Sequence, residues 1–243
     1  MSTIEKRPCR LVMFSGYCVD ISKDNVQIAE TADKTLRAVA IASSRIPRWN
    51  GHLRLPLALF EELDKATAIP ANRIFDNGLE MEPSEDLELY VSYAVMHHSL
   101  LVDRIICQWA EQDILHGHDI RQLRLQALLH EIGENIISDI PGPFKAIPEV
   151  RGAVKPIERH VEECLAHTIG VDFPWDPIIK SADILAQDIE GYFGYKEHHR
   201  DVNVSSDFSY ENWMKSALVD SAAEGPVDFY HRVLQLLHDS RDK

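Results

Sequence analysis

The sequence predicts an all-α protein. In several stretches of the 243-residue chain, apolar residues recur at intervals of three or four, the spacing that gives a helix one buried face. Alternation of apolar and polar residues, which is typical of half-buried strands, is scarce, and prolines separate the helical stretches. Because the chain shows neither an internal repeat nor a low-complexity tract, we expect one domain over residues 1–243.

Apolar spacing defines the expected helices in chain order. They cover residues 28–44, 85–112, 121–139, 155–169, 178–193, 213–223 and 227–238. The region 53–90 is the least regular: a helix at 57–66 is compatible with its apolar residues, and the Asn-Gly and acidic segments that follow predict loop. Residues 205–243 are expected to form a C-terminal helical extension.

The helix predicted over 121–139 carries an unusual set of polar residues. Asp119 is suited to cap its start, and Pro141 prevents it from continuing far. Its apolar face nevertheless contains His130, Glu131 and Glu134. Burying a carboxylate without a partner costs roughly several kcal/mol, so we expect a charged group to contact these side chains. A divalent cation is the simplest candidate.

The helix predicted over 85–112 contains two adjacent histidines. The residues one and two turns from His98 are apolar, whereas His97 has Tyr90 and Arg104 two turns away. His98 is therefore the histidine that we expect to be buried.

Composition excludes several classes of partner. The net charge of −14 disfavours binding to polymeric nucleic acid, although it permits a small anionic substrate. No apolar run is long enough to cross a bilayer, and the start does not resemble a signal peptide. The four cysteines form no Cys-x-x-Cys pair, which fits reduced thiols and a cytoplasmic location. A homo-oligomer is compatible with this sequence.

Four residues from three predicted helices form a candidate ligand set: His98, His130, Glu131 and Asp183. Taken one at a time, each histidine also fits a hydrogen-bonded core residue, and His130-Glu131 fits a structural pair. Together, two imidazoles and two carboxylates suit one divalent metal ion with positions left open for water. This donor set does not distinguish Co, Mn, Zn, Fe and Mg.

With these residues, the chain resembles the HD-domain metal-dependent phosphohydrolases, in particular bacterial 5′-deoxynucleotidases and phage deoxynucleotide phosphohydrolases. The likeness covers most of residues 15–190. It is carried by SGYCVD at 15–20, IASSRIPRWNGH at 41–52, HSLLV at 98–102, LLHEIGENIISDIP at 128–141 and SAD at 181–183. The resemblance implies a helical bundle that hydrolyses phosphate from a nucleotide, either a 5′-monophosphate or a triphosphate.

Two features depart from that family pattern. The family's paired His-Asp is here His130-Glu131, whose carboxylate reaches one methylene further. The stretch 53–90 is interpreted as an insertion, because this branch usually passes directly to the first histidine. A specificity lid, an oligomer contact and a neutral decoration are all compatible with it.

The resemblance also implies roles around the ion, which His98, His130, Glu131 and Asp183 would hold. Glu134 would transfer protons to and from water or the leaving 5′ oxygen. For Asp139 two hypotheses stand: an orienting acidic residue, or a turn or cap residue before Pro141.

The implied substrate contacts come mainly from the segment around residue 48. Arg48 would clamp phosphate, with Arg45 or Lys145 as helpers. Trp49 would pack near the sugar or base and exclude a 2′-hydroxyl. A core or rim aromatic is the alternative for Trp49, and Arg45 and Arg48 would then be solvated.

Three functional hypotheses follow. The first is a deoxynucleotide phosphohydrolase. The second is an HD hydrolase of another phosphate ester or signalling nucleotide. The third is a catalytically silent nucleotide-binding module in which Glu131 marks the loss of the metal.

Overall fold

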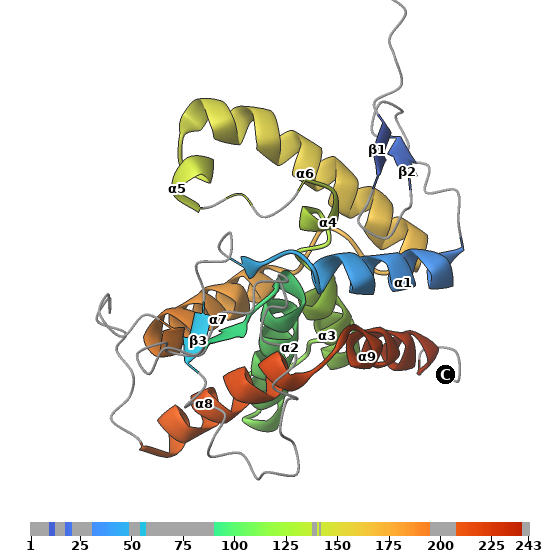
Figure 1. Cartoon of the computed structure of the whole chain (residues 1–243). Coiled ribbons are helices and arrows are strands. Elements are labelled where there is room, and N and C mark those ends of the chain that lie inside the picture. The colour runs from blue at the N-terminus through green and yellow to red at the C-terminus, as the bar shows by residue number, and fades with distance from the viewer. Residues whose placement is uncertain are drawn as a thin grey trace, which may run out of the picture.

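The computed structural model describes residues 10–12, 18–20, 31–48, 54–56, 90–137, 140, 142–194 and 208–239. These residues form an all-α architecture, which confirms the predicted fold class. The helices are α1 (Ala32–Ser43), α2 (Val95–Glu111), α3 (Ile120–Leu129), α4 (Glu134–Ile137), α5 (Gly142–Lys145), α6 (Pro148–Ile169), α7 (Pro177–Gly194), α8 (Phe208–Ala223) and α9 (Pro226–His238) (Figure 1). Among these described helices, none combines the length and apolar character needed to cross a membrane.

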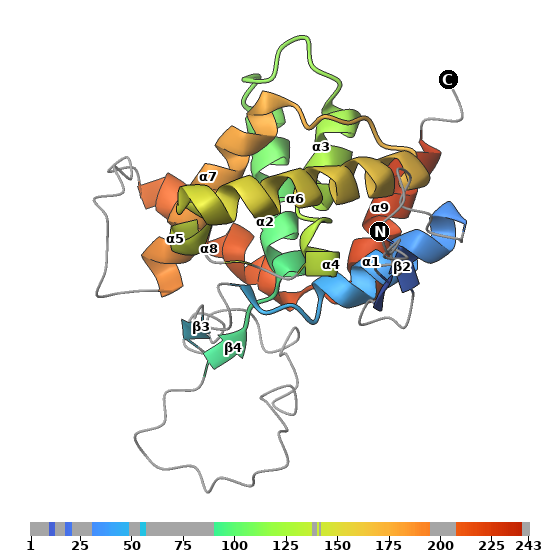
Figure 2. The same cartoon turned by 90° about the horizontal axis from the view of Figure 1, so that it is seen from above.

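Helix α2 lies at the centre of the bundle. It packs against α3, α7 and α8, while α1 contacts α6 and α9 on another side (Figures 1 and 2). The adjacent residues Leu100 and Leu101 of α2 are both fully buried, each in a different apolar cluster. Because α2 is covered on several sides, a polar residue on it, such as His98, can be fully buried.

Two apolar clusters form the core. The first lies among α2, α3, α7 and α8 and includes Leu101, Ile105, Ala186, Ile189 and Leu218. The second joins α1, α2, α3, α6 and α9 and includes Leu36, Leu100, Leu128, Leu165 and Val233. Burial of these side chains is the main stabilising contribution to the bundle.

A buried ion-pair network connects the C-terminal helices to this bundle. The Asp103 carboxylate on α2 is fully buried and accepts hydrogen bonds from Arg124 Nε (2.8 Å) and Arg124 Nη2 (3.0 Å) of α3. Arg232 of α9 donates to Asp103 (3.1 Å) and also to Glu224 (2.5 Å), which in turn accepts from Arg104. The network fixes α9, and the residue that follows α8, against α2 and α3.

Among the described residues, two pairs of three-residue strands accompany the helices. β1 (Arg10–Val12) pairs antiparallel with β2 (Cys18–Asp20), and β3 (Arg54–Pro56) pairs antiparallel with β4 (Tyr90–Ser92). The second pair joins the two ends of the predicted insertion, so 54–56 and 90–92 lie side by side. The loops and the short helix predicted within 57–89 lie outside the described residues, as does the loop predicted at 197–204.

Several helix ends differ from the sequence prediction. α2 begins at Val95 rather than at residue 85, because residues 90–92 pair with β3 and Val95 N bonds to Ile46 O (2.9 Å). α6 begins at Pro148, seven residues earlier than expected. Proline fits the first helical position because its missing N–H has no partner to lose there. The helix also accommodates Pro156, which lies in its exposed N-terminal half.

Candidate metal centre

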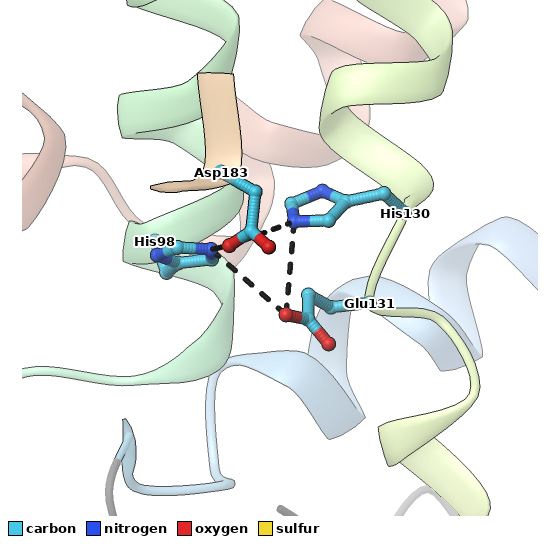
Figure 3. A group of neighbouring side chains, drawn as sticks. All are labelled: His98, His130, Glu131 and Asp183. Carbon is cyan, nitrogen blue, oxygen red and sulfur yellow. Dashed lines mark hydrogen bonds and ion pairs between the residues drawn. The ribbon is translucent and has the colours of Figure 1, made fainter. Parts of the chain in front are cut away.

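Two imidazoles and two carboxylates meet where α2, α3 and α7 approach one another. His98 lies in the first turn of α2, His130 caps the end of α3, and Asp183 lies in α7. Glu131 follows in the turn toward α4. Each residue offers one ligand atom, and these atoms all lie within 4.8 Å of one another (Figure 3). The structure therefore brings together all four predicted ligands in a cluster that could hold a metal ion.

A break in the predicted central helix allows adjacent residues to serve this cluster. The single helix expected over 121–139 is wrong: α3 ends at Leu129, and α4 begins at Glu134. Between them, Ile132 N bonds to Leu129 O (3.0 Å) and Glu134 N to Glu131 O (3.0 Å), bonds that span three residues rather than four. Consecutive side chains of an α-helix point about 100° apart, since 3.6 residues complete a turn. The tighter turn instead directs both His130 and Glu131 to the cluster.

The nitrogen–oxygen separations within the cluster are compatible with a single ion. Asp183 Oδ1 lies 3.1 Å from His98 Nε2 and 4.0 Å from His130 Nε2. Glu131 Oε1 lies 3.9 Å from His98 Nε2 and 3.7 Å from His130 Nε2. Zinc-type ions bind nitrogen and oxygen at about 2.0–2.2 Å, and two ligands of one ion cannot be further apart than twice that length. All four separations satisfy this limit.

Hydrogen bonds fix both imidazoles with the same nitrogen toward the cluster. His98 Nδ1 lies 2.6 Å from Glu190 Oε1, and His130 Nδ1 lies 2.7 Å from Ala127 O. Because a carboxylate and a carbonyl only accept, each Nδ1 carries a proton and donates. Each Nε2 then faces the cluster, an orientation typical of histidines that bind metals.

An unsatisfied buried atom provides the clearest indication that a cation fits here. His130 Nε2 is buried and makes no hydrogen bond within the described part of the chain. Buried polar atoms almost always have a partner, because an unpaired one loses its hydration without compensation. A bound ion would satisfy this nitrogen.

Two neighbours hold the Asp183 carboxylate in place. Lys180 Nζ lies 2.5 Å from Asp183 Oδ2, and Gln187 Nε2 donates to Asp183 Oδ1 over 2.7 Å. These residues lie three positions before and four after Asp183 on α7, so one helix supplies both the ligand and its supports.

The local charges set the protonation of the cluster. Burial, together with the Arg48 charge, lowers the pKa of His98, but Glu190 and Asp183 outweigh both and raise this pKa to about 9. Burial lowers the pKa of His130. Burial raises the pKa of Glu131, yet Arg48 and the two histidines bring it down to about 2. Thus Glu131 is ionised, and His98 must release a proton before its Nε2 can bind an ion.

Arg48 lies directly beside the cluster, with 5% of its surface exposed. Its Nη1 is 3.3 Å from Glu131 Oε1, and its Nη2 is 3.2 Å from His98 Nε2. Hydrogen bonds from Arg48 N to Tyr93 O and from Val95 N to Ile46 O join residues 46–48 to the start of α2. This pairing places a buried guanidinium next to the candidate ligands.

Glu134 and Lys145 form the next layer. Glu134 is buried, with Oε2 3.9 Å from Arg48 Nη1 and Oε1 3.3 Å from Lys145 Nζ. Lys145 also contacts Glu158 (3.0 Å), and the nearby carboxylates raise its pKa although burial lowers it. Arg45 follows α1 with an exposed side chain. The predicted site residues Trp49 and Asp139 lie outside the described residues.

Sequence reasoning missed three acidic residues around this centre. Glu190 is fully buried and bonds to His98; it lies seven residues after Asp183, a spacing that places both on one face of α7 and could have indicated it. Glu158 and Glu162 lie on α6 beside the turn that contains Gly133. A Cβ at Gly133 would stand 3.2 Å from Glu162 Cγ, so the glycine permits this close approach. No spacing in the sequence indicates Glu158 or Glu162, because only the packing of α6 against the turn with Gly133 places them beside the site.

Comparison with known proteins adds no assignment: no family model matches the chain, and no curated protein sequence matches it at a significant level.

Proposed function

We propose that this protein is a metal-dependent phosphohydrolase that acts on deoxynucleotides. The observation that carries the proposal is the convergence of His98, His130, Glu131 and Asp183, with a buried arginine beside them. Two imidazoles and two carboxylates suit a divalent ion, and a guanidinium matches the oxygens of a phosphoryl group. The residue-level likeness to HD-domain phosphohydrolases supports the same reaction.

The four ligands would hold the ion, and Arg48 would bind the substrate next to it. A divalent ion here supplies Lewis-acid chemistry, acidifying a nearby water and offsetting phosphoryl charge. Arg48 would donate from its two terminal nitrogens to two phosphoryl oxygens. Its contacts with Glu131 and Glu134 orient the guanidinium before substrate arrives.

Glu134 would carry the proton. It is buried between Arg48 and Lys145, whose positive charges keep its carboxylate oriented. During hydrolysis a water oxygen bonds to phosphorus, the bond from phosphorus to the 5′ oxygen breaks, and one proton moves from the water to that oxygen. A fixed carboxylate next to the phosphate-binding arginine is suited to relay this proton.

Metal content tests the proposal first. We expect about one divalent ion per chain, by elemental analysis, after purification or reconstitution. His130→Ala and Asp183→Ala should each lose the ion, whereas the control His167→Ala, at an exposed position of α6, should retain it. Unchanged metal in both site variants would refute the ligand assignment.

A nucleotide panel then tests the reaction. When matched deoxy- and ribonucleotides are compared, we expect the deoxynucleotides to be hydrolysed preferentially, by a factor on the order of a hundred at most. Trp49→Ala should reduce this preference. Phosphate release only from non-nucleotide esters would favour the other HD hydrolase. Nucleotide binding without metal or turnover would favour the silent module.

A further inference from the structure

A basic cavity lies next to the candidate metal centre, between α5 and the N-terminal half of α6. Its volume is about 300 Å³, and it is lined by Lys145, Ala146, Arg151, Val154, Lys155 and Glu158. Three of these six residues are cationic, in a chain whose net charge is −14. Such a concentration of positive charge in an acidic protein favours an anionic ligand.

Two of the three cations are available for such a ligand. Lys145 Nζ lies 3.0 Å from Glu158 Oε1, so the one acidic residue among the described residues of the lining is already paired. Within the part of the chain that the structure describes, neither Arg151 nor Lys155 forms an ion pair. They are four residues apart on α6, about 6 Å along the helix axis, and therefore lie on one face.

Contacts connect this cavity to the site of the reaction. Lys145 Nζ lies 3.3 Å from Glu134 Oε1, and Glu134 Oε2 lies 3.9 Å from Arg48 Nη1. Arg48 in turn contacts Glu131 of the ligand cluster. The cationic groups therefore follow one another from the metal centre outward: Arg48, then Lys145, then Arg151 and Lys155.

A series of cations leading away from the reacting centre matches an extended chain of phosphates. Sites for complete small ligands occupy roughly 300–1,000 Å³, so this cavity is at the lower limit and suits part of a nucleotide. We infer that the cavity binds the distal phosphates of a deoxynucleoside triphosphate. The proposed function is the basis of this inference, and Arg151 and Lys155 become determinants of phosphate-chain length.

The implied reaction is balanced. A water oxygen bonds to the α-phosphorus, and the bond between the α-phosphorus and the 5′ oxygen breaks. One water proton ends on the 5′ oxygen of the released deoxynucleoside. Tripolyphosphate is the second product, and the cavity holds its two distal phosphate groups until release.

Binding of inorganic tripolyphosphate to the full, metal-free chain tests the cavity without requiring catalysis. In isothermal calorimetry, the double variant Arg151→Gln/Lys155→Gln should weaken binding by about tenfold or more, since the loss of even one charge-assisted hydrogen bond costs a factor of about ten. The control Arg159→Gln removes one positive charge from the next turn of α6, outside the residues that line the cavity, and should change the dissociation constant by less than about twofold. Equal losses in both variants, or no binding to the wild-type chain, would overturn the inference.

Hydrolysis of matched deoxynucleoside mono- and triphosphates separates this inference from the proposed function. The ratio of kcat/KM for triphosphate to that for monophosphate should fall about tenfold in the double variant. If both substrates are hydrolysed and the ratio does not change, the cavity inference fails and the proposed function stands. If no nucleotide is hydrolysed but tripolyphosphate binds in an Arg151-dependent manner, the proposed function fails and the cavity still binds a phosphate chain.

Discussion

Glu190 Oε1 lies 2.6 Å from His98 Nδ1, and both residues are completely buried. Glu190 Oε2 is also 3.7 Å from Arg48 Nε. One carboxylate therefore orients both a candidate metal ligand and the arginine expected to bind phosphate. A carboxylate that accepts from a ligating histidine makes the imidazole more basic and fixes the nitrogen that faces the metal.

Replacing this carboxylate by its amide should weaken metal binding without leaving a cavity in the core. We expect Glu190→Gln to lower metal affinity by about 10- to 100-fold, because the hydrogen bond persists but the charge is lost. The pKa of His98 in the metal-free protein should also fall below its value of about 9, since Glu190 is one of the groups that raise it. Competition with a chelator measures the affinity, and NMR titration of the imidazole measures the pKa.

The matched control for Glu190→Gln is Asp188→Asn, a carboxylate-to-amide change two residues earlier on the same helix. Asp188 is partly exposed and should affect neither quantity. Equal metal affinity in Glu190→Gln and in the wild-type protein would show that the carboxylate serves packing alone.

A second prediction concerns the buried network at Asp103. Asp103→Asn should lower the free energy of unfolding by about 3 kcal/mol, because Arg124 and Arg232 would keep their charges and lose the carboxylate between them. Urea unfolding measures this change. Asp220→Asn removes a more exposed partner of Arg104 and should cost less than about 1 kcal/mol. Similar costs for the two variants would mean that the buried network does not fix α9.

How far the sequence predicts this structure depends on whether the determining contacts are local. Apolar spacing predicted the all-α class and placed α7 and α9 within one residue at each described end, since helix periodicity is a local property. The pairing of β3 with β4 was missed because its three-residue strands are far apart in the chain. Such short segments carry no detectable alternation.

The candidate site shows the same division. The four ligands could be selected because polar residues on apolar helix faces are conspicuous in a sequence. The break after Leu129 could not be predicted, because the helical apolar pattern continues through Ile132 and Ile136. Glu190 shares a face of α7 with Asp183, but it was missed because the residue that justifies its burial, His98, lies 92 positions away.

A third prediction concerns pH and the Glu162 carboxyl on α6. Burial, with the charges of Glu131 and Glu158, raises its pKa from 4.5 to about 7. The folded state therefore binds this proton more tightly than the unfolded state does, so the contribution of Glu162 to stability is present at low pH. It is lost as the pH rises from about 4.5 to about 7. Glu162→Gln cannot titrate and should not show this loss.

The measurement is urea unfolding of the metal-free protein between pH 5 and pH 8, because a bound cation would offset the charge of Glu131. Relative to the wild-type protein, Glu162→Gln should gain on the order of 2 kcal/mol across this range. The control Glu163→Gln changes the adjacent, exposed residue and should follow the wild-type curve. A Glu162→Gln curve parallel to the wild-type curve would contradict the raised pKa.

The last prediction concerns Glu131, which replaces the aspartate expected from the family likeness. Its Oε1 lies 3.3 Å from Arg48 Nη1 and 3.7 Å from His130 Nε2, so the longer side chain contacts both the arginine and the ligand cluster. Aspartate keeps the charge and should still reach the ion after a small shift of that ion toward the backbone. We therefore expect Glu131→Asp to retain metal and turnover, with an altered preference among divalent ions.

Glu131→Ala provides the contrast. It removes a ligand outright, which should exceed the roughly 10- to 100-fold loss of affinity caused by removing an outer partner. Elemental analysis and turnover with several divalent ions compare the two variants with the wild-type protein. If Glu131→Asp lost metal and turnover as completely as Glu131→Ala, the centre would require the additional methylene. The contact between Arg48 and Glu131 would then be the reason, because an aspartate at this position could not reach the guanidinium and the ion together.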